Sequence, residues 1–327
     1  MIEKIAENLY TTRVPLPDNP LRYINVYIIK GADEGDRTLV IDTGFNRPEC
    51  ENAIQEALDE LEVKDVDIFI THLHSDHCGL AARFASRNST VYTGEIDGEY
   101  INFEVGSLYW SMLEDLFATH GFPKATDGRK NTDFHPGRQY SLDKRVDFTY
   151  ISDGDVLEYG GYRLRAFMTP GHTPGHMCLY DEENRRLFSG DHILGTITPN
   201  ITLELGVENP LGDYLESLAR TDKLKVDHIM NTHGTHVDNM HERIAELYEH
   251  HTARAAEVVK LLGNDWKHAY DVAADMTWEI DCRNWDEFPV AQKWFATGEA
   301  VSHLQYLMYE GKVIREERNG VWYYRNK

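Results

Sequence analysis

The amino-acid sequence predicts an α+β fold, in which two β-sheets pack face to face and carry helices on their outer faces. Two observations predict this αββα sandwich, and a third indicates an additional small domain. Strand and helix patterns alternate along most of the 327 residues. The alternation occurs in two similar halves, which a helix-rich stretch over about residues 95–145 separates. Near the C-terminus, Asn319-Gly320 is a strong hairpin signal and indicates a further small domain.

The strands are predicted from short runs of β-branched and aromatic residues that are bounded by turn residues. In the first half these runs lie at 8–12, 23–29, 38–41, 67–71 and 90–92. Pro48 begins a helical pattern with Ile54, Leu58 and Leu61 on one face, and residues 79–86 form a shorter one. In the second half the strands are expected at 148–151, 162–167, 177–180, 186–188 and 226–230, with helices at 213–224 and 239–262.

The stretch 95–145 contains a helical pattern over 100–117 with large apolar residues, followed by a segment punctuated by glycine and proline. It is expected either to cover a site or to serve only as a packing element. A boundary at 263–265 divides the chain into a catalytic domain, 1–262, and a C-terminal domain, 263–327. Helices followed by the Asn319-Gly320 hairpin give this second domain a winged-helix-like outline.

Composition excludes several classes of protein. Hydrophobic residues make up 41% of the chain, which is enough for a sizeable core, and the net charge of −22 opposes polyanions in general. The four cysteines show no C-x-x-C spacing, so a zinc ribbon or a disulfide framework is not expected. No apolar stretch approaches the ~20 residues of a membrane helix, and the N-terminus lacks the pattern of a secretory signal. We therefore expect a cytoplasmic protein with no membrane partner.

The segment Thr71 to His77 carries the clearest chemical signal, because His72, His74, Asp76 and His77 lie within six residues. In an extended segment, residues two apart face the same side, so His72 and His74 can reach one metal ion together. A turn toward the following helix lets Asp76 and His77 point at a second ion. Imidazole and carboxylate are ligands of zinc, iron and manganese in hydrolytic sites.

Three further segments place potential ligands where a predicted strand ends. They contain His172 in Gly171-His172-Thr173-Pro174-Gly175-His176, Asp191 in Ser189-Gly190-Asp191, and His233 in Thr232-His233-Gly234. Ligands at several strand ends can converge on one edge of a sheet, and the neighbouring glycines allow a close backbone approach.

Together these motifs, H-x-H-x-D-H, G-H-T-P-G-H, S-G-D and a late His-Gly, resemble the metallo-β-lactamase superfamily over approximately residues 5–255. The layout is most similar to the β-lactamase-like protein 2 and hydroxyacylglutathione hydrolase-like groups. The resemblance implies that His72, His74 and His172 hold a first metal ion. It also implies that Asp76, His77 and His233 hold a second, that Asp191 bridges both, and that Asp42 orients ligands from behind.

Other residues near the motifs have weaker claims to a role. His176, His192 and His236 neighbour ligands, but the family pattern does not use them. His241, His250 and His251 lie on the predicted long helix, where solvated or capping roles are expected. Cys78 follows His77 directly and is expected to be a small buried residue.

The cofactors implied are two divalent metal ions, with zinc first and iron or manganese accepted by the same ligands. Such ions generate a nucleophile from water and polarise the substrate. Asp76 and Asp191 are the expected catalytic residues, because Asp191 would hold the ions in place and Asp76 would orient the nucleophile. Leu194 stands where acyl-homoserine lactonases of the superfamily carry a tyrosine, so the leaving-group donor of that reaction is missing.

Three functions are compatible with these residues. The preferred one is a hydrolase of a small ester or thioester, whose partner is a small molecule and whose pocket is lined by the 95–145 stretch. The alternative is a metal-dependent endoribonuclease, because the tail has cations that can contact phosphate: Lys312, Arg315, Arg318, Arg325 and Lys327. A metal-dependent sensor is the third. The tail alternatively serves packing or dimerisation, so a homodimer is also considered.

Overall fold

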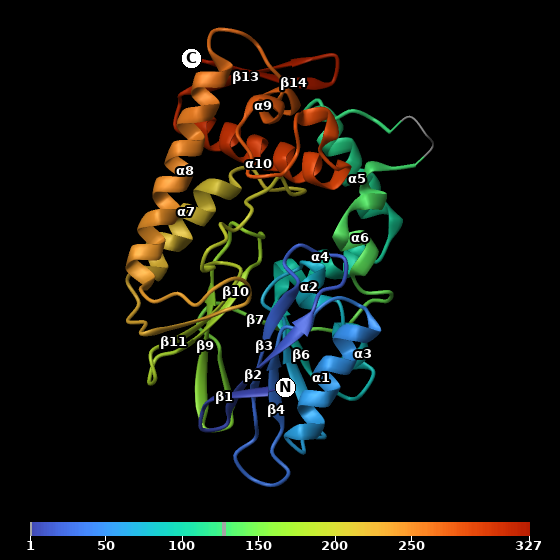
Figure 1. Cartoon of the computed structure of the whole chain (residues 1–327), viewed down its shortest axis with the longest axis vertical. Coiled ribbons are helices and arrows are strands. Elements are labelled where there is room, and N and C mark those ends of the chain that lie inside the picture. The colour runs from blue at the N-terminus through green and yellow to red at the C-terminus, as the bar shows by residue number, and fades with distance from the viewer. Residues whose placement is uncertain (1, 126–128) are drawn as a thin grey trace.

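The computed structural model describes residues 2–125 and 129–327 and contains the predicted αββα sandwich (Figure 1). One sheet has the strand order β1-β2-β3-β4-β5-β6-β7, and the other has the order β12-β11-β10-β9-β8. Apolar side chains from both sheets, among them Leu39, Phe69, Leu164 and Phe188, form one buried cluster. Burial of this cluster on both inner faces holds the two sheets together.

The first sheet consists of β1 (Ile2–Ala6), β2 (Leu9–Pro15), β3 (Tyr23–Ile29), β4 (Thr38–Ile41), β5 (Val66–Phe69), β6 (Val91–Gly94) and β7 (Thr149–Ile151). The second consists of β8 (Val156–Tyr159), β9 (Tyr162–Met168), β10 (Met177–Asp181), β11 (Arg186–Gly190) and β12 (His228–Asn231). β4 is parallel to β5, and β11 is parallel to β12. β9 and β11 are both antiparallel to β10, so they run in the same direction. The loops that follow these parallel-running strands therefore leave each sheet at one edge.

Helices cover the outer face of each sheet (Figure 1). α1 (Pro48–Glu60) and α3 (Ala81–Ala85) pack on the first sheet, and α7 (Pro210–Thr221) and α8 (Met240–Leu262) pack on the second. Asn239 caps α8, because its side chain accepts hydrogen bonds from the backbone N–H groups of His241 and Glu242. Among the described residues, no helix combines the length and the apolar character needed to cross a membrane.

The structure differs from the sequence prediction in three places. The helix expected at 79–86 is instead two short helices, α2 (Ser75–Cys78) and α3, so the histidine run itself enters a helix. The single helix expected at 100–117 is α4 (Glu95–Glu104) and α5 (Ser107–Thr119), and Gly106 between them has extended backbone angles. β1 and β8 were not predicted, since both are short, and β1 contains two adjacent charged residues and β8 one.

The remaining elements follow the insertion and the sandwich. The insertion ends with the short helices η1 (Asn131–Phe134) and α6 (Pro136–Tyr140). The C-terminal region contains α9 (Ala269–Asp275), η2 (Trp285–Glu287), α10 (Val290–Tyr309), β13 (Val313–Arg318) and β14 (Val321–Asn326). The predicted hairpin is confirmed, with β13 and β14 antiparallel and positive φ angles of 52° at Asn319 and 80° at Gly320.

The C-terminal region and the insertion share one hydrophobic core. A single buried cluster joins Trp110 and Phe117 of α5, Val258 of α8 and Trp294 of α10. The rings of Phe117 and Trp294 stack with centroids 3.7 Å apart. α10 is thereby held across the top of the sandwich, next to the edge at which the histidine segments lie (Figure 1). The proposed domain boundary at residue 263 stays a prediction.

Candidate metal centre

The predicted ligand segments come together at one edge of the sandwich, where the strands that precede them end. His72 and His74 follow β5, His172 follows β9, Asp191 follows β11, and His233 follows β12. Within the described residues, these side chains and their neighbours form three overlapping groups whose ligand atoms lie within 4.8 Å of one another. Each group is able to hold a metal ion.

The first group contains His72, His74 and His172. The imidazole rings of His72 and His74 lie with centroids 4.8 Å apart, and those of His74 and His172 lie 4.5 Å apart, both pairs nearly perpendicular. His72 and His74 stand two residues apart in a bend between β5 and α2, where His74 has extended backbone angles. The structure therefore places together the three residues assigned to a first metal ion.

The second group contains Asp76, His77 and His233. Asp76 and His77 lie on α2, and the ring of His77 stays beside that of His72, with centroids 3.9 Å apart, so that His72, His77 and Asp191 form the group that joins the other two. The Nε2 atom of His233 is 3.3 Å from the Nε2 atom of His77 and 3.3 Å from Oδ2 of Asp76. These are the three residues assigned to a second metal ion.

Asp191 lies between the two groups. Its Oδ1 atom is 3.4 Å from Nε2 of His77, and its Oδ2 atom is 3.6 Å from Nε2 of His172. The hydroxyl of Thr232 donates to Oδ1, and the backbone N–H of Asp191 donates to Nε2 of His176. Each carboxylate oxygen thus faces a different group, which is the orientation that a bridging ligand requires.

Hydrogen bonds at the Nδ1 atoms of two histidines orient their Nε2 atoms toward the proposed metal position. The Nδ1 atom of His172 donates to the carbonyl of Asn200 at 2.8 Å, and that of His233 donates to the carbonyl of Tyr23 at 3.1 Å. Because Nδ1 is the donor in both rings, Nε2 is the atom left to face a metal ion. The buried Nε2 atoms of His72 and His172 have no hydrogen-bond partner, so they fit a ligand role.

Asp42 supports the site from behind, as the family resemblance implied. It occupies the residue directly after β4, is fully buried, and has a φ angle of 63°. Its carboxylate accepts hydrogen bonds from Nδ1 of His77 at 2.9 Å and from the backbone and hydroxyl of Thr71. The same hydroxyl lies 3.0 Å from Nδ1 of His72. One buried carboxylate therefore orients histidines of both groups.

The electrostatics of the site divide the histidines into two sets. Burial and mutual repulsion lower the pKa of His74 to about 3 and depress that of His72 strongly, so both rings are neutral. Burial also opposes the charging of His77, but Asp191 and Asp42 outweigh it and raise the pKa of His77. The clustered carboxylates thus demand a nearby positive charge, which divalent cations supply.

Asp97, in the first turn of α4, is a positioning residue that the sequence did not reveal. Its Oδ2 atom accepts from the backbone N–H of Leu73 at 2.9 Å and from the hydroxyl of Thr173 at 2.6 Å. Its Oδ1 atom accepts from the backbone N–H of Gly175 at 2.6 Å. This buried carboxylate therefore ties the loop of His72 and His74 to the loop of His172. A single aspartate in a helical pattern carries no local signal of such a role.

The other histidines lie outside the ligand groups. Both ring nitrogens of His176 have hydrogen-bond partners, and His192 Nε2 bonds the hydroxyl of Thr221. His236 is exposed, whereas His251, expected to be solvated or capping, is buried beside His303. That expectation was wrong because α10 packs over this part of α8.

Cys78 is fully buried, and its thiol donates to the carbonyl of Leu73 at 3.0 Å. Burial raises the pKa of this thiol strongly, so the thiol is neutral. Cys78 thus packs against the ligand loop, as expected of a small buried residue.

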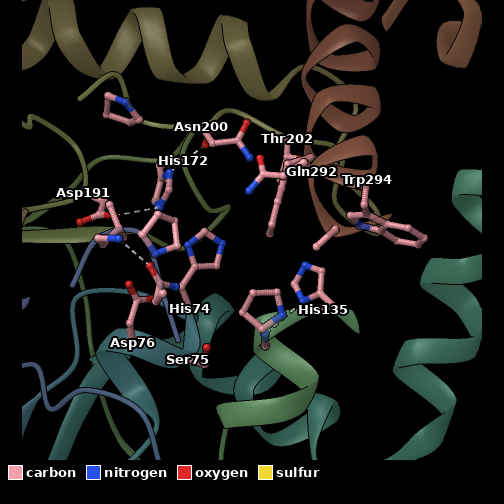
Figure 2. Close-up of a pocket in the computed structure, with 18 of the residues that line it drawn as sticks. His74, Ser75, Asp76, His135, His172, Asp191, Asn200, Thr202, Gln292 and Trp294 are labelled. Atoms are coloured by element: carbon pink, nitrogen blue, oxygen red, sulfur yellow. Dashed lines mark hydrogen bonds and ion pairs between the residues drawn. The ribbon is translucent and has the colours of Figure 1, made fainter. Parts of the chain in front are cut away.

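A cavity of about 540 Å³ opens beside the metal-ligand groups. Figure 2 shows His74, Asp76, His172 and Asp191 on one side of it, and His135, Gln292 and Trp294 on the opposite side. The insertion contributes apolar side chains such as Tyr109, Leu113 and Phe134, and α10 contributes Trp294 and Phe295. The insertion therefore both packs and lines the cavity, which the sequence had left open. The contribution of α10 and of the preceding loop, through Trp278 and Ile280, was not predicted.

The sandwich and its edge of histidines and aspartates define a metal-binding hydrolase of the metallo-β-lactamase fold. Residues 19–233 match the Metallo-beta-lactamase superfamily, and the chain belongs to it. Residues 282–327 match the Metallo-beta-lactamase-like, C-terminal domain. The predicted family and fold are therefore confirmed.

Three similar proteins illustrate this membership. A beta-lactamase-like protein 2 homolog of Caenorhabditis elegans is 29% identical over 267 residues, which cover 80% of this chain and 73% of the relative. An atrochrysone carboxyl ACP thioesterase of Aspergillus fumigatus is 25% identical over 244 residues, 75% of this chain and 61% of the relative. The crystal structure of a metallo-beta-lactamase family protein from Thermus thermophilus covers 99% of this chain and is itself fully covered, with 29% identity and a TM-score of 0.83.

Proposed function

We propose that this protein hydrolyses an ester or thioester bond of a small acyl substrate, with two divalent metal ions at the centre described above. The cavity beside the ligand groups carries the proposal. It is mostly apolar and aromatic, and its volume of about 540 Å³ lies in the range of small-molecule sites. The similarity to a named thioesterase supports the choice of bond.

The assignment of ligands follows the geometry. His72, His74 and His172 would hold one ion, Asp76, His77 and His233 the other, and Asp191 both. When bound, two such ions supply a nucleophile from water at neutral pH and polarise the substrate carbonyl. We propose zinc, while iron and manganese suit the same donors.

The residues of the chain would orient and enclose the reaction. The hydroxyl of Thr232 donates a hydrogen bond to the Asp191 carboxylate, and the backbone N–H of Asp191 donates one to Nε2 of His176. Together these hydrogen bonds orient the carboxylate between the two ligand groups. Asp76 has its pKa lowered to about 2, because His77 and His233 outweigh the effect of burial. It is therefore ionised at neutral pH and can accept a proton or hydrogen bond at Oδ2. The apolar walls exclude water from the acyl chain.

The endoribonuclease alternative lacks support at the cavity. Among the described residues that line it, none is lysine or arginine. The arginines of the tail instead lie on aromatic rings of the hairpin region, Arg315 over Trp322 and Arg325 over Trp266. RNA binding requires cations along the backbone path. We therefore propose a small molecule, not nucleic acid, as the partner of this site.

The proposal is tested with purified protein loaded with zinc, manganese or iron and offered acyl thioesters, aryl esters and single-stranded RNA. We expect turnover of esters or thioesters, and loss of that turnover in Asp191→Ala. His236→Ala is the matched control, because this exposed histidine lies three residues after His233 without joining the ligand groups. RNA cleavage that disappears in His72→Ala, without acyl hydrolysis, would overturn the proposal.

A further inference from the structure

Two glutamates form an acidic recess in the wall of the cavity. Glu104 is the last residue of α4, and Glu204 lies four residues after Asn200, whose carbonyl holds His172. Both line the cavity that also contains His74 and His172, and both are only 7% exposed. The hydroxyl of Tyr109, which is also buried, donates to Glu204 at 3.2 Å.

These carboxyl groups lack the partners that buried acids normally have. The Oε2 atom of Glu104 is buried without any hydrogen-bond partner. Within the part of the chain that the structure describes, neither glutamate forms an ion pair, and no lysine or arginine lines the cavity. Burial of an acid without a cation or a full set of donors is costly. Such an acid either stays protonated or ionises beside a cation, and in this recess a cation can come only from a ligand that enters the cavity.

We propose that Glu104 and Glu204 bind a protonated amine carried by the acyl substrate. This inference rests on the proposed function and names its substrate class, an amino-acyl ester or thioester. The scissile bond would lie at the ligand groups, and the ammonium would lie at the acidic recess of the same cavity. An ammonium has three donors, which match the free oxygens of two carboxylates.

The surroundings of the recess favour a cation over a neutral donor. Tyr109 lies edge to face with Trp110, Phe103 and Tyr100, so its ring and hydroxyl are held in place. The cavity is lined further by Trp294, and aromatic faces attract an ammonium group. A hydroxyl would satisfy one acceptor without compensating charge, whereas an ammonium donates to several acceptors and neutralises one ionised carboxylate, with the second carboxyl group protonated.

Burial also predicts a proton exchange on binding. Burial and the nearby charge of Asp97 raise the pKa of Glu204 to about 8, and burial and Glu204 raise that of Glu104 strongly. At neutral pH the carboxyl groups of Glu104 and Glu204 are therefore mainly protonated before a cation binds. When an ammonium binds, one of the two carboxyl groups ionises and releases its proton to the solvent, while the other carboxyl group and the amine keep theirs.

The experiment uses the zinc-loaded full chain and three simple probes: n-butylammonium, n-butanol and n-butyrate. Calorimetric titration in two buffers with different ionisation heats reports affinity and proton release without any turnover. We expect n-butylammonium to bind at least about tenfold more tightly than n-butanol, with proton release at pH 7. The preference should be lost in Glu204→Gln and reduced in Glu104→Gln. Asp18→Asn is the control, because this exposed residue lines the same cavity.

The outcomes separate this inference from the proposed function. Equal affinity for amine and alcohol, absence of binding, or an unchanged preference in Glu204→Gln would overturn the amine site. A kinetic pair, 4-aminobutyryl and pentanoyl thioesters, supplies the second arm, in which the amino substrate should have the lower KM. Hydrolysis without amine preference refutes only the inference. Selective amine binding with no ester or thioester hydrolysis refutes only the proposed bond type.

Discussion

Replacement of Asp97 by asparagine tests how the metal centre is positioned. The substitution keeps the size of the side chain but exchanges one carboxylate oxygen for an NH2 group. Asp97 accepts three hydrogen bonds, from Leu73, Thr173 and Gly175, and its side chain is fully buried. Leu73 lies between His72 and His74, so the change acts on the ligand loops without removing a ligand.

The magnitude follows from the two backbone donors. If the asparagine carbonyl faces Leu73, its NH2 group faces the N–H of Gly175, and two donors then oppose each other. A buried N–H without an acceptor costs about 1–3 kcal/mol, and the lost charge assistance adds to this cost. The loop that carries Gly175 can move to separate the two donors, but this movement also displaces the metal ligands. Since about 1.4 kcal/mol is a factor of ten, we expect zinc affinity to fall about 10–100-fold.

Competition with a chromophoric chelator measures this affinity, and urea unfolding of the metal-free protein measures stability. Asp181→Asn is the matched control. Asp181 is also buried and accepts a backbone N–H, from Asn184 at 3.1 Å, but it lies at the end of β10 away from the ligands. The control should lose stability and keep its zinc affinity. If Asp97→Asn behaves like the control, Asp97 is only structural and the reasoning fails.

Three further predictions concern the backbone, the acidic recess and the metal ions. Gly171→Ala should lower the free energy of unfolding by about 2–4 kcal/mol in a urea titration, because φ is 139° and a Cβ atom would collide with Tyr214; an unchanged value contradicts the geometry. Glu204 has a folded pKa of about 8, above its unfolded value of 4.5, so the folded state holds a proton that the unfolded state releases. The stability of the wild type relative to Glu204→Gln should therefore fall as the pH rises from about 4.5 to 8, and a flat difference would show that Glu204 is ionised. Zinc at 100 times its Kd should raise the unfolding free energy of the chelator-treated protein by about 2.7 kcal/mol for each site that it fills, whereas identical unfolding curves would mean that no ion binds.

The ligand residues were predictable from the sequence because their signals are local. Each stands directly after a strand whose apolar run is visible, and parallel strands deliver their ends to one edge. The four positions from His72 to His77 also fall within a single short segment. Only the start of the following helix was predicted wrongly. It begins earlier, with α2, which has just four residues and shows no helical periodicity.

The residues that shape the cavity were not predictable, because their roles depend on tertiary packing. Asp97, Glu104 and Glu204 are isolated acids, and in a sequence such residues resemble a solvated surface. Asp97 is buried between the two ligand loops, and Glu104 and Glu204 are buried in the wall of the cavity that α5 and α10 also line. Helices were predicted before the C-terminal hairpin, but helical periodicity does not identify what a face packs against. For this reason Trp294 and Gln292 were missed as cavity residues.

α4 links the metal centre to the selection of substrate. Asp97 in its first turn holds the loops of His72, His74 and His172, and Glu104 at its end lines the acidic recess. Seven residues of α-helix separate these two positions by roughly 10 Å. A substrate with its scissile bond at the ligand groups and its amine at the acidic recess would extend along this helix. A change in the length or tilt of α4 would therefore alter metal geometry and substrate length together, whereas changes on α10 would alter only the opposite wall.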